Sequence, residues 1–251
     1  MLHLIGTGLS PKGITIEAID LCKNSDFVYV DTYTSFISAE KIEFIKEQIG
    51  KGISGLYRQD MEEKASKIVN QAINNDVCVL VGGDPLMATT HKTIFLEAKK
   101  KGVKISISHS GSILNAVIGG SGLDFYRFGQ ITTLPNWSEH YKPMSFYNII
   151  SNNIKNNLHT ILLFDYDWKS GNSVSVKEAI TVLKKAESEF RKGIIRDDTF
   201  VIIMNNLAQE KESKYYITIE EAEEIDTKGL TTMVIPAALS EIEKELINSI
   251  Y

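Results

Sequence analysis

The most constraining feature of this sequence is a short apolar run that ends in two glycines. Residues 77–81 read VCVLV, and the chain continues as GGDP through residues 82–85. A continuous apolar run of this length is typical of a strand buried on both faces, as in a parallel sheet covered by helices. The glycine turn that follows is therefore expected at the carboxyl end of a strand, where open α/β sheets bind their ligands.

Strand-like and helix-like segments alternate on both sides of this turn. The first half of the chain predicts strands at 2–6, 26–31, 77–81 and 103–110, and helices at 13–25, 38–49, 61–75 and 89–102. Ser38 is a candidate N-cap for the second of these helices. This order predicts an α/β fold with a mainly parallel sheet.

The second half of the chain is less regular. It predicts extended structure near 125–135, helices at 143–157 and 175–190, strands at 158–167, 199–206, 214–219 and 231–236, and a terminal helix with Leu239, Ile242, Leu246 and Ile250 on one face. The change of character near residue 110 predicts two α/β lobes. The first spans 1–109 and has a mainly parallel sheet; the second spans 110–251 and has a mixed sheet.

Composition excludes several classes of protein. The net charge is −5, whereas direct binding to nucleic-acid phosphates needs a basic face, so no nucleic-acid contact is expected. An apolar stretch long enough to cross a membrane is absent from the sequence. Cys22 and Cys78 lie inside apolar patterns and are expected as buried free thiols in a reducing, cytoplasmic setting. The histidines and cysteines show no metal-ligand spacing, so no metal site is predicted.

The first glycine turn, GTGLSPKG at residues 6–13, offers a second candidate ligand site. A dinucleotide fingerprint would need glycine at position 11, where this chain has Pro11. Asp31 fits the acidic ribose position only loosely. A nicotinamide or flavin site is therefore the weaker interpretation of this turn.

Seven motifs occur in an order that points to a known family. They are LIGTGLSPKGITIEAID, DTYTS, GGDPLMATTH, HSGSILNAV, YRFG, PMSFYNII and LHTILLFD. In this order they resemble the diphthine synthases, which belong to the tetrapyrrole-methylase-like class of S-adenosylmethionine (SAM) methyltransferases. The resemblance is good over about residues 1–165 and weak over the remainder.

The resemblance implies a fold and an activity. Such proteins have two α/β lobes, form homodimers and bind SAM in the cleft between the lobes. Their substrate is a histidine of translation elongation factor 2 that already carries a 3-amino-3-carboxypropyl group. Repeated methylation of the amino group of that side chain gives diphthine and releases S-adenosylhomocysteine.

The resemblance also implies which residues contact the cofactor. By position in the motifs they are Leu9, Asp84, Met87, Ser112, Ile113 and Phe164, followed by Leu207 and Thr231 in the weaker part of the match. The chain departs from the family at 205–208, where NNLA replaces a small, glycine-bearing segment. It departs again at 231–239, where TTMVIPAAL replaces a segment that commonly holds a histidine and a Pro-Gly pair.

Several residues have competing interpretations. Asp84 could accept a hydrogen bond from SAM or could cap the segment after the turn. The substrate amine must lose a proton before each attack, and Asp165, at a strand end, is the first candidate acceptor. His91 is a second candidate that could instead brace the turn, and His109 could do the same before Ser110.

Two alternative functions remain open at the level of sequence. One is methylation of a porphyrin-like or corrin-like ring, which would call for a cluster of basic residues around a ring with many carboxylates. The arginines Arg58, Arg127, Arg191 and Arg196 are scattered along the chain instead. The other is a SAM-binding protein without activity, which the departures from the family in the second half of the chain would allow.

Overall fold

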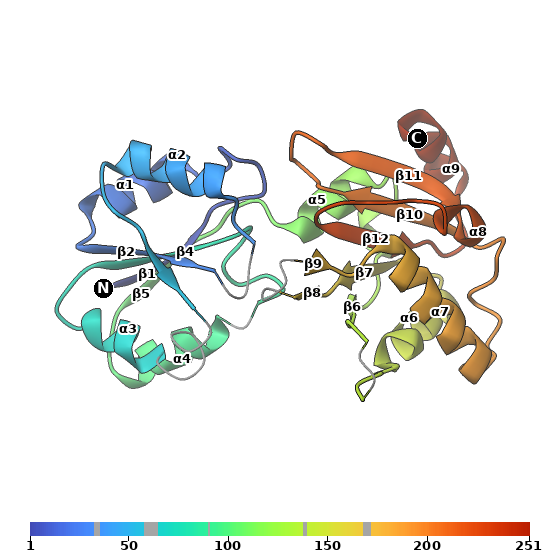
Figure 1. Cartoon of the computed structure of the whole chain (residues 1–251), viewed down its shortest axis with the longest axis horizontal. Coiled ribbons are helices and arrows are strands. Elements are labelled where there is room, and N and C mark those ends of the chain that lie inside the picture. The colour runs from blue at the N-terminus through green and yellow to red at the C-terminus, as the bar shows by residue number, and fades with distance from the viewer. Residues whose placement is uncertain (33–35, 58–64, 90, 138–139, 168–171) are drawn as a thin grey trace. The chain divides into compact units, whose positions relative to one another are not determined.

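The computed structural model describes residues 1–32, 36–57, 65–89, 91–137, 140–167 and 172–251. The chain divides into two compact units, Met1–Leu114 and Asn115–Tyr251 (Figure 1). The sequence placed the change of lobe between residues 109 and 110. The predicted α/β class, with a parallel sheet in the first unit and a mixed sheet in the second, is confirmed.

The N-terminal unit is built on a parallel sheet in the order β3-β2-β4-β1-β5. Its strands are β1 (Leu2–Gly6), β2 (Phe27–Asp31), β3 (Ser54–Leu56), β4 (Val77–Val81) and β5 (Ile105–Ser108). Strand β1 lies between β4 and β5 and is parallel to both. The carboxyl ends of these three neighbouring strands therefore meet at one edge of the sheet. Strand β3 is a short strand that the sequence pattern missed.

Helices cover both faces of this sheet, with α1 (Ile16–Asn24) and α2 (Ala39–Ile49) on one face and α3 (Ala65–Gln71) and α4 (Lys92–Lys100) on the other (Figure 1). Strand β4 shows why its sequence is apolar throughout. Cys78 and Leu80 pack in the core under α1 and α2, whereas Val79 packs in the core under α3 and α4. Ser38 caps α2 as predicted, because its hydroxyl accepts a hydrogen bond from the Lys41 backbone. Residues 61–64 of the predicted third helix lie outside the described residues.

The C-terminal unit contains a mixed sheet in the order β11-β10-β12-β7-β6. Its strands are β6 (Thr132–Leu134), β7 (Thr160–Phe164), β10 (Phe200–Asn205), β11 (Ser213–Thr218) and β12 (Thr231–Ile235), and β8 (Tyr166–Asp167) pairs with β9 (Asn172–Ser173) as a separate ribbon. Strands β6 and β7 are parallel, whereas β12 is antiparallel to both β7 and β10.

Helices α6 (Ser145–Lys155) and α7 (Val176–Phe190) cover one face of the mixed sheet (Figure 1). Phe146 and Tyr147 of α6 and Ile180 and Leu183 of α7 are fully buried in this core. The other helices among the described residues are α5 (Ile113–Gly120), which contains the division between the units, η2 (Phe125–Arg127), α8 (Ile219–Ala222) and α9 (Glu241–Ile250). The sequence predicted extended structure over η2; Asp124 instead caps this short helix by accepting from the Tyr126 backbone.

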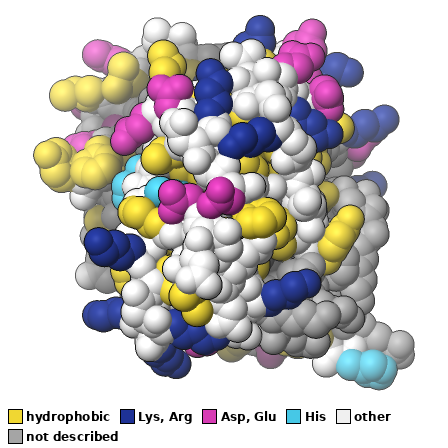
Figure 2. Space-filling model, turned by 90° about the vertical axis from the view of Figure 1, so that its left-hand side faces the viewer, with side chains coloured by type: hydrophobic (Ala, Val, Ile, Leu, Met, Phe, Trp, Pro, Cys, Tyr) yellow, Lys and Arg dark blue, Asp and Glu magenta, His cyan; other side chains and the backbone are white. Residues whose placement is uncertain are grey.

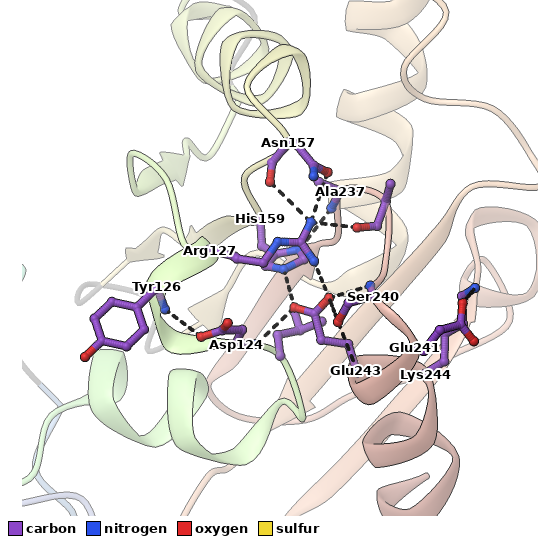
Figure 3. A network of polar contacts seen from close by, with 12 residues as sticks. Asp124, Tyr126, Arg127, Asn157, His159, Ala237, Ser240, Glu241, Glu243 and Lys244 are labelled. Carbon is purple, nitrogen blue, oxygen red and sulfur yellow. Dashed lines mark hydrogen bonds and ion pairs between the residues drawn. The ribbon is translucent and has the colours of Figure 1, made fainter.

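A buried polar network attaches α9 to the rest of the C-terminal unit (Figure 3). The Glu243 carboxylate accepts hydrogen bonds from the backbone of Asp124 and Ser240, the Ser240 hydroxyl, Arg127 and Nε2 of His159. Burial alone would raise the pKa of Glu243, but these hydrogen bonds outweigh it and lower the pKa to about 2. The carboxylate is therefore ionised in the folded protein and fully occupied by donors.

This network fixes the orientation of α9. Glu243 and Ile247 face inward, whereas Ile242, Leu246 and Ile250 are exposed by 71%, 46% and 44%. The apolar face that the sequence pattern predicted therefore exists, but it does not lie in the core of the unit. The reason is that a satisfied carboxylate takes the inward position of the first turn.

The surface of the N-terminal unit carries charges of both signs. Figure 2 looks onto the side of the molecule that this unit occupies and shows basic, acidic and hydrophobic side chains intermixed over the visible face. Cys22 and Cys78 are buried and free. Within the described part of the chain, no helix is long and apolar enough to cross a membrane.

Candidate functional site

Three loops meet at the carboxyl edge of the parallel sheet. They follow β1, β4 and β5 and comprise residues 7–13, 82–86 and 109–112. Gly8 and Gly83 exchange two backbone hydrogen bonds of 3.1 and 3.2 Å, which join the first loop to the second. The Ser110 hydroxyl donates to the Gly13 carbonyl at 3.2 Å, which joins the third loop to the first.

Glycine is required where these loops touch. Gly8 and Gly83 have φ angles of +67° and +69°, in the left-handed region that side chains disfavour. A Cβ on Gly8 would lie 2.6 Å from a backbone oxygen across the loop. A Cβ on Gly83 would lie 3.9 Å from both the Leu9 side chain and the Ser112 Cα. The structure thus brings Leu9, Ser112 and the turn before Asp84 together.

A buried lysine braces the first of these loops. The Lys41 ammonium, on α2, donates to the carbonyls of Thr7, Gly8 and Leu9 at 3.2, 2.6 and 3.2 Å. The residue is 4% exposed, and burial lowers its pKa to about 8. Sequence reasoning missed Lys41, because a lysine on an amphipathic helix is indistinguishable from the solvated lysines beside it.

Asp84 lies at the centre of the three loops and is 6% exposed. One carboxylate oxygen accepts from the Leu86 backbone at 3.0 Å, which fixes the turn. The other accepts from Nδ1 of His109 at 2.7 Å and from the Ser110 backbone at 3.3 Å. Asp84 therefore has the bracing role that turn chemistry suggested, and it also links the turn after β4 to the loop after β5.

Asp31 and His91 form a second buried pair in this unit. His91 Nε2 lies 2.9 Å from Asp31 Oδ2, and both side chains are fully buried. The other ring nitrogen of His91 contacts the Thr89 hydroxyl. Both nitrogens of His91 are thus engaged inside the protein, which fits bracing rather than proton transfer to a ligand. Full burial also removes Asp31 from the surface that a ribose would have to reach.

The remaining two predicted residues of the first unit lie beside this centre. Met87 follows the Asp84 turn and is 51% exposed, while its backbone donates to the Asp84 carbonyl at 3.3 Å. Ile113 is partly buried and begins α5 directly after Ser112. Met87 and Ile113 therefore both adjoin the loops, and Met87 lies on the side that faces solvent.

The three predicted cofactor residues of the C-terminal unit gather at one edge of the mixed sheet. Phe164 ends β7, Leu207 follows β10 and Thr231 begins β12; all three are buried, with exposures of 9%, 8% and 5%. Asn205 pairs with Thr231 across the sheet and donates to its hydroxyl at 2.9 Å. This arrangement puts the Thr231 hydroxyl and the Asn205 amide beside the apolar side chains of Phe164 and Leu207.

The unusual NNLA segment keeps a glycine-like backbone. Asn206 and Ala208 have φ angles of +49° and +61°, so both occupy the left-handed region. Asn206 is among the residues that tolerate this conformation, and its side chain secures the turn by accepting from the Leu230 backbone at 3.1 Å. Residues 205–208 therefore form a tight turn without a glycine.

Asp165 is exposed and takes part in the turn after β7. Its carboxylate accepts from its neighbour Tyr166 at 3.0 Å and from the Asn136 backbone at 3.4 Å. These contacts fit a strand-end aspartate that stabilises local turns. Its role in proton transfer stays a prediction.

The chain belongs to the family of tetrapyrrole (corrin/porphyrin) methylases, whose model matches residues 1–223. Within that class it belongs to the diphthine synthases, and the resemblance predicted from the sequence motifs is confirmed. It is 32% identical over 251 residues to the diphthine synthase of Methanocaldococcus jannaschii, covering 98% of this chain and 97% of that protein.

Two further relatives agree with this membership. An Arabidopsis thaliana protein named as a probable diphthine methyl ester synthase is 32% identical over 269 residues, covering 98% of this chain and 97% of its own length. A crystal structure of diphthine synthase superimposes with a TM-score of 0.88 at 31% identity, covering 99% of this chain and 95% of that one.

Proposed function

We propose that this chain is a SAM-dependent methyltransferase that repeatedly N-methylates the 3-amino-3-carboxypropyl-histidine of translation elongation factor 2, giving diphthine and S-adenosylhomocysteine. Family membership supports the reaction. The observation that carries the proposal is the convergence of three loops around Asp84 at the carboxyl edge of the parallel sheet. Open α/β sheets bind their ligands at that edge.

The groups at the loops fit the polar end of SAM. An ionised carboxylate has about four acceptor positions. The three hydrogen bonds to Asp84 leave capacity for a ligand hydroxyl or ammonium. The bare backbone of Gly83 allows close approach of a ligand, and Leu9 and Ile113 supply apolar surface. In this unit the proposal assigns the cofactor contacts to Leu9, Asp84, Met87, Ser112 and Ile113.

In the C-terminal unit the proposal assigns cofactor contacts to Phe164, Leu207 and Thr231. Two of these are apolar and one carries a hydroxyl, a mixture suited to a purine base with polar edges. When bound, SAM supplies an activated methyl group on a sulfonium. The protein then has to align the amine with that methyl carbon and exclude water, which requires neither a nucleophilic triad nor a metal.

Mass spectrometry of elongation factor 2 tests the reaction. The substrate is factor 2 that bears the aminocarboxypropyl-histidine intermediate, incubated with this protein and SAM. Successive methyl masses on that residue would support the proposal, and the final count would show where the reaction stops. SAM binding without any mass shift would contradict the proposed acceptor and favour ring methylation. Methyl transfer would exclude an inactive SAM-binding protein.

The role of Asp84 is separable from that reaction. We expect Asp84→Ala to weaken SAM binding, measured by titration calorimetry, far more than it lowers thermal stability. Asp20→Ala on exposed α1 surface is a matched control for the loss of charge. Equal losses of affinity and stability in Asp84→Ala would mean that Asp84 only braces the turn.

We also propose that the chain forms a homodimer and works in the cytoplasm. The exposed apolar side chains of α9, Ile242, Leu246 and Ile250, supply surface that a second copy could cover. The buried free thiols of Cys22 and Cys78 support a reducing compartment. Light scattering coupled to gel filtration tests the dimer, and a monomeric mass at working concentrations would refute it. Cell fractionation tests the compartment.

A further inference from the structure

His109 combines an anchored ring nitrogen with an exposed ring. It directly follows β5 and precedes the Ser110–Ser112 turn. Its Nδ1 lies 2.7 Å from Oδ2 of Asp84, and the side chains of His109 and Asp84 are 67% and 7% exposed. Because an ionised carboxylate only accepts hydrogen bonds, the Nδ1 atom of His109 carries the proton. In the neutral ring, Nε2 therefore holds a lone pair on the exposed side.

Two other histidines differ from His109 in both burial and hydrogen bonding. His159 is buried, donates from Nε2 to Glu243 and accepts at Nδ1 from the Ala237 backbone. His91 is also buried with both nitrogens engaged. These rings hold the fold together and have no nitrogen directed to solvent. His109, by contrast, is fixed at one nitrogen by a buried carboxylate and is largely exposed.

We propose that His109 is the proton acceptor for the substrate amine and that Asp84 is its positioning residue. The inference rests on the proposed function, because it concerns the same amine and the same cofactor loops. A carboxylate that holds one imidazole nitrogen fixes the tautomer and stabilises the imidazolium that forms. Asp84 would therefore fix both the turn and the orientation and tautomer of the His109 ring.

The reaction balances without a further reagent. The substrate ammonium gives one proton to Nε2 of His109, which leaves an amine and an imidazolium paired with Asp84. The amine lone pair forms a bond to the methyl carbon of SAM while the carbon–sulfur bond breaks, and sulfur keeps that electron pair. The exposed imidazolium then releases its proton to solvent. The cycle repeats until the nitrogen has no proton left to lose.

The structure favours His109 over Asp165 for this task. Asp165 directly follows Phe164, but its carboxylate is committed to local turns through the Asn136 and Tyr166 backbones. His109 contacts Asp84 directly and lies in the same loop as Ser112. The proton acceptor is thus placed by two loops that the proposed function already uses.

The test compares His109→Asn with the wild type and with His140→Asn, a control at an exposed histidine. Asparagine retains a donor toward Asp84 but does not titrate. The first methylation of modified elongation factor 2 is followed by mass spectrometry at saturating SAM, from neutral to alkaline pH. SAM affinity is measured by calorimetry on the same proteins.

We expect His109→Asn to lose about 100-fold in the rate of the first methylation at neutral pH, a typical contribution of a general base. SAM affinity should not change. The difference in methylation rate between His109→Asn and the wild type should become smaller toward alkaline pH, because more of the substrate amine is then already deprotonated. Imidazole added to a His109→Ala variant should restore part of the rate, which a merely structural role would not allow.

Other outcomes would overturn the inference. Methylation by His109→Asn at the rate of the wild type would refute it, and so would a deficit that is independent of pH and of added imidazole. A loss confined to SAM affinity would make His109 a binding residue. A rate lost in Asp165→Asn but retained in His109→Asn would return the role to Asp165. Absence of methylation by the wild type would instead refute the proposed function itself.

Discussion

Replacing Glu243 by glutamine tests how much the buried network around α9 contributes to stability. Glutamine has nearly the same shape but only one acceptor oxygen. The two carboxylate oxygens of Glu243 serve two donors and three donors respectively. Whichever way the amide is turned, at least two buried donors then face an NH₂ group. Unpaired buried donors of this kind are costly.

The pKa of Glu243 gives the magnitude. A fall from the ordinary 4.5 to about 2 corresponds to about 3 kcal/mol of favourable interaction with the carboxylate. Since the folded pKa is depressed, this stabilisation is complete above pH 4.5 and is lost as the pH falls toward 2. By pH 3.5, about 1.4 kcal/mol of it should already be gone.

Urea unfolding followed by tryptophan fluorescence measures the effect. Both tryptophans, Trp137 and Trp168, lie in the C-terminal half of the sequence, so the signal reports on the unit that contains α9. Glu241→Gln is the matched control, because Glu241 is in the same first helical turn but is 86% exposed and pairs only with Lys244 at the surface (Figure 3).

We expect Glu243→Gln to lose about 3 kcal/mol at pH 7 and the control to lose less than about 1 kcal/mol. The difference in the free energy of unfolding between Glu243→Gln and the wild type should shrink as the pH approaches 3.5. The reasoning would be refuted if the two variants were equally stable at pH 7. It would also be refuted if the gap stayed constant on acidification.

Three further predictions follow from individual contacts, each checked by denaturant unfolding. Gly8→Ala should lower the free energy of unfolding more than Gly102→Ala does. Both glycines have φ of +67°, but only at Gly8 would the new Cβ collide with backbone, at 2.6 Å. Equal losses would show that the loop adapts. Lys41→Met should lower the free energy of unfolding by about 1–3 kcal/mol and weaken SAM binding through the unbraced first loop, whereas Lys46→Met, at a partly exposed position of α2, should lower it by less than about 0.5 kcal/mol. Tyr147→Phe should lower the free energy of unfolding by about 1 kcal/mol, because the Tyr147 hydroxyl donates at 2.6 Å to Glu187 of α7. Glu187 keeps its backbone donors in the variant, so the loss should be no larger. No loss would mean that this hydrogen bond only replaces one to water.

Part of the fold and the family could be predicted from the sequence alone. The apolar run at 77–81 predicted a doubly buried strand, because each face of β4 needs its own hydrophobic core. Glycines at the carboxyl end of that strand predicted a tight turn at the ligand-binding edge. Seven short motifs then identified the family, because residues in such turns are constrained by both backbone geometry and chemistry.

Local patterns were less informative where tertiary contacts decide the outcome. Periodicity found the apolar face of α9 but could not tell whether that face lies inward, because hydrophobic spacing does not say which face a buried network will hold inward. Strand β3 is too short to give a pattern. The residue types of Asn206 and Ala208 do not predict a tight turn of the kind that glycines form. Both nevertheless have the positive φ angles of such a turn, because side-chain hydrogen bonds and the flanking strands hold the backbone there.

Only the tertiary structure showed what lies against the glycine turn. Lys41 is more than thirty residues from the Gly8 and Leu9 carbonyls that it binds, and His109 is 25 residues from Asp84. No short-range pattern encodes such pairs, because the parallel sheet brings the ends of β1, β4 and β5 together only once all three strands have formed. The sequence alone thus predicted the fold and the edge of the sheet at which the candidate site lies. The neighbours of Asp84, and with them its proposed part in moving a proton, were decided by how the three loops pack.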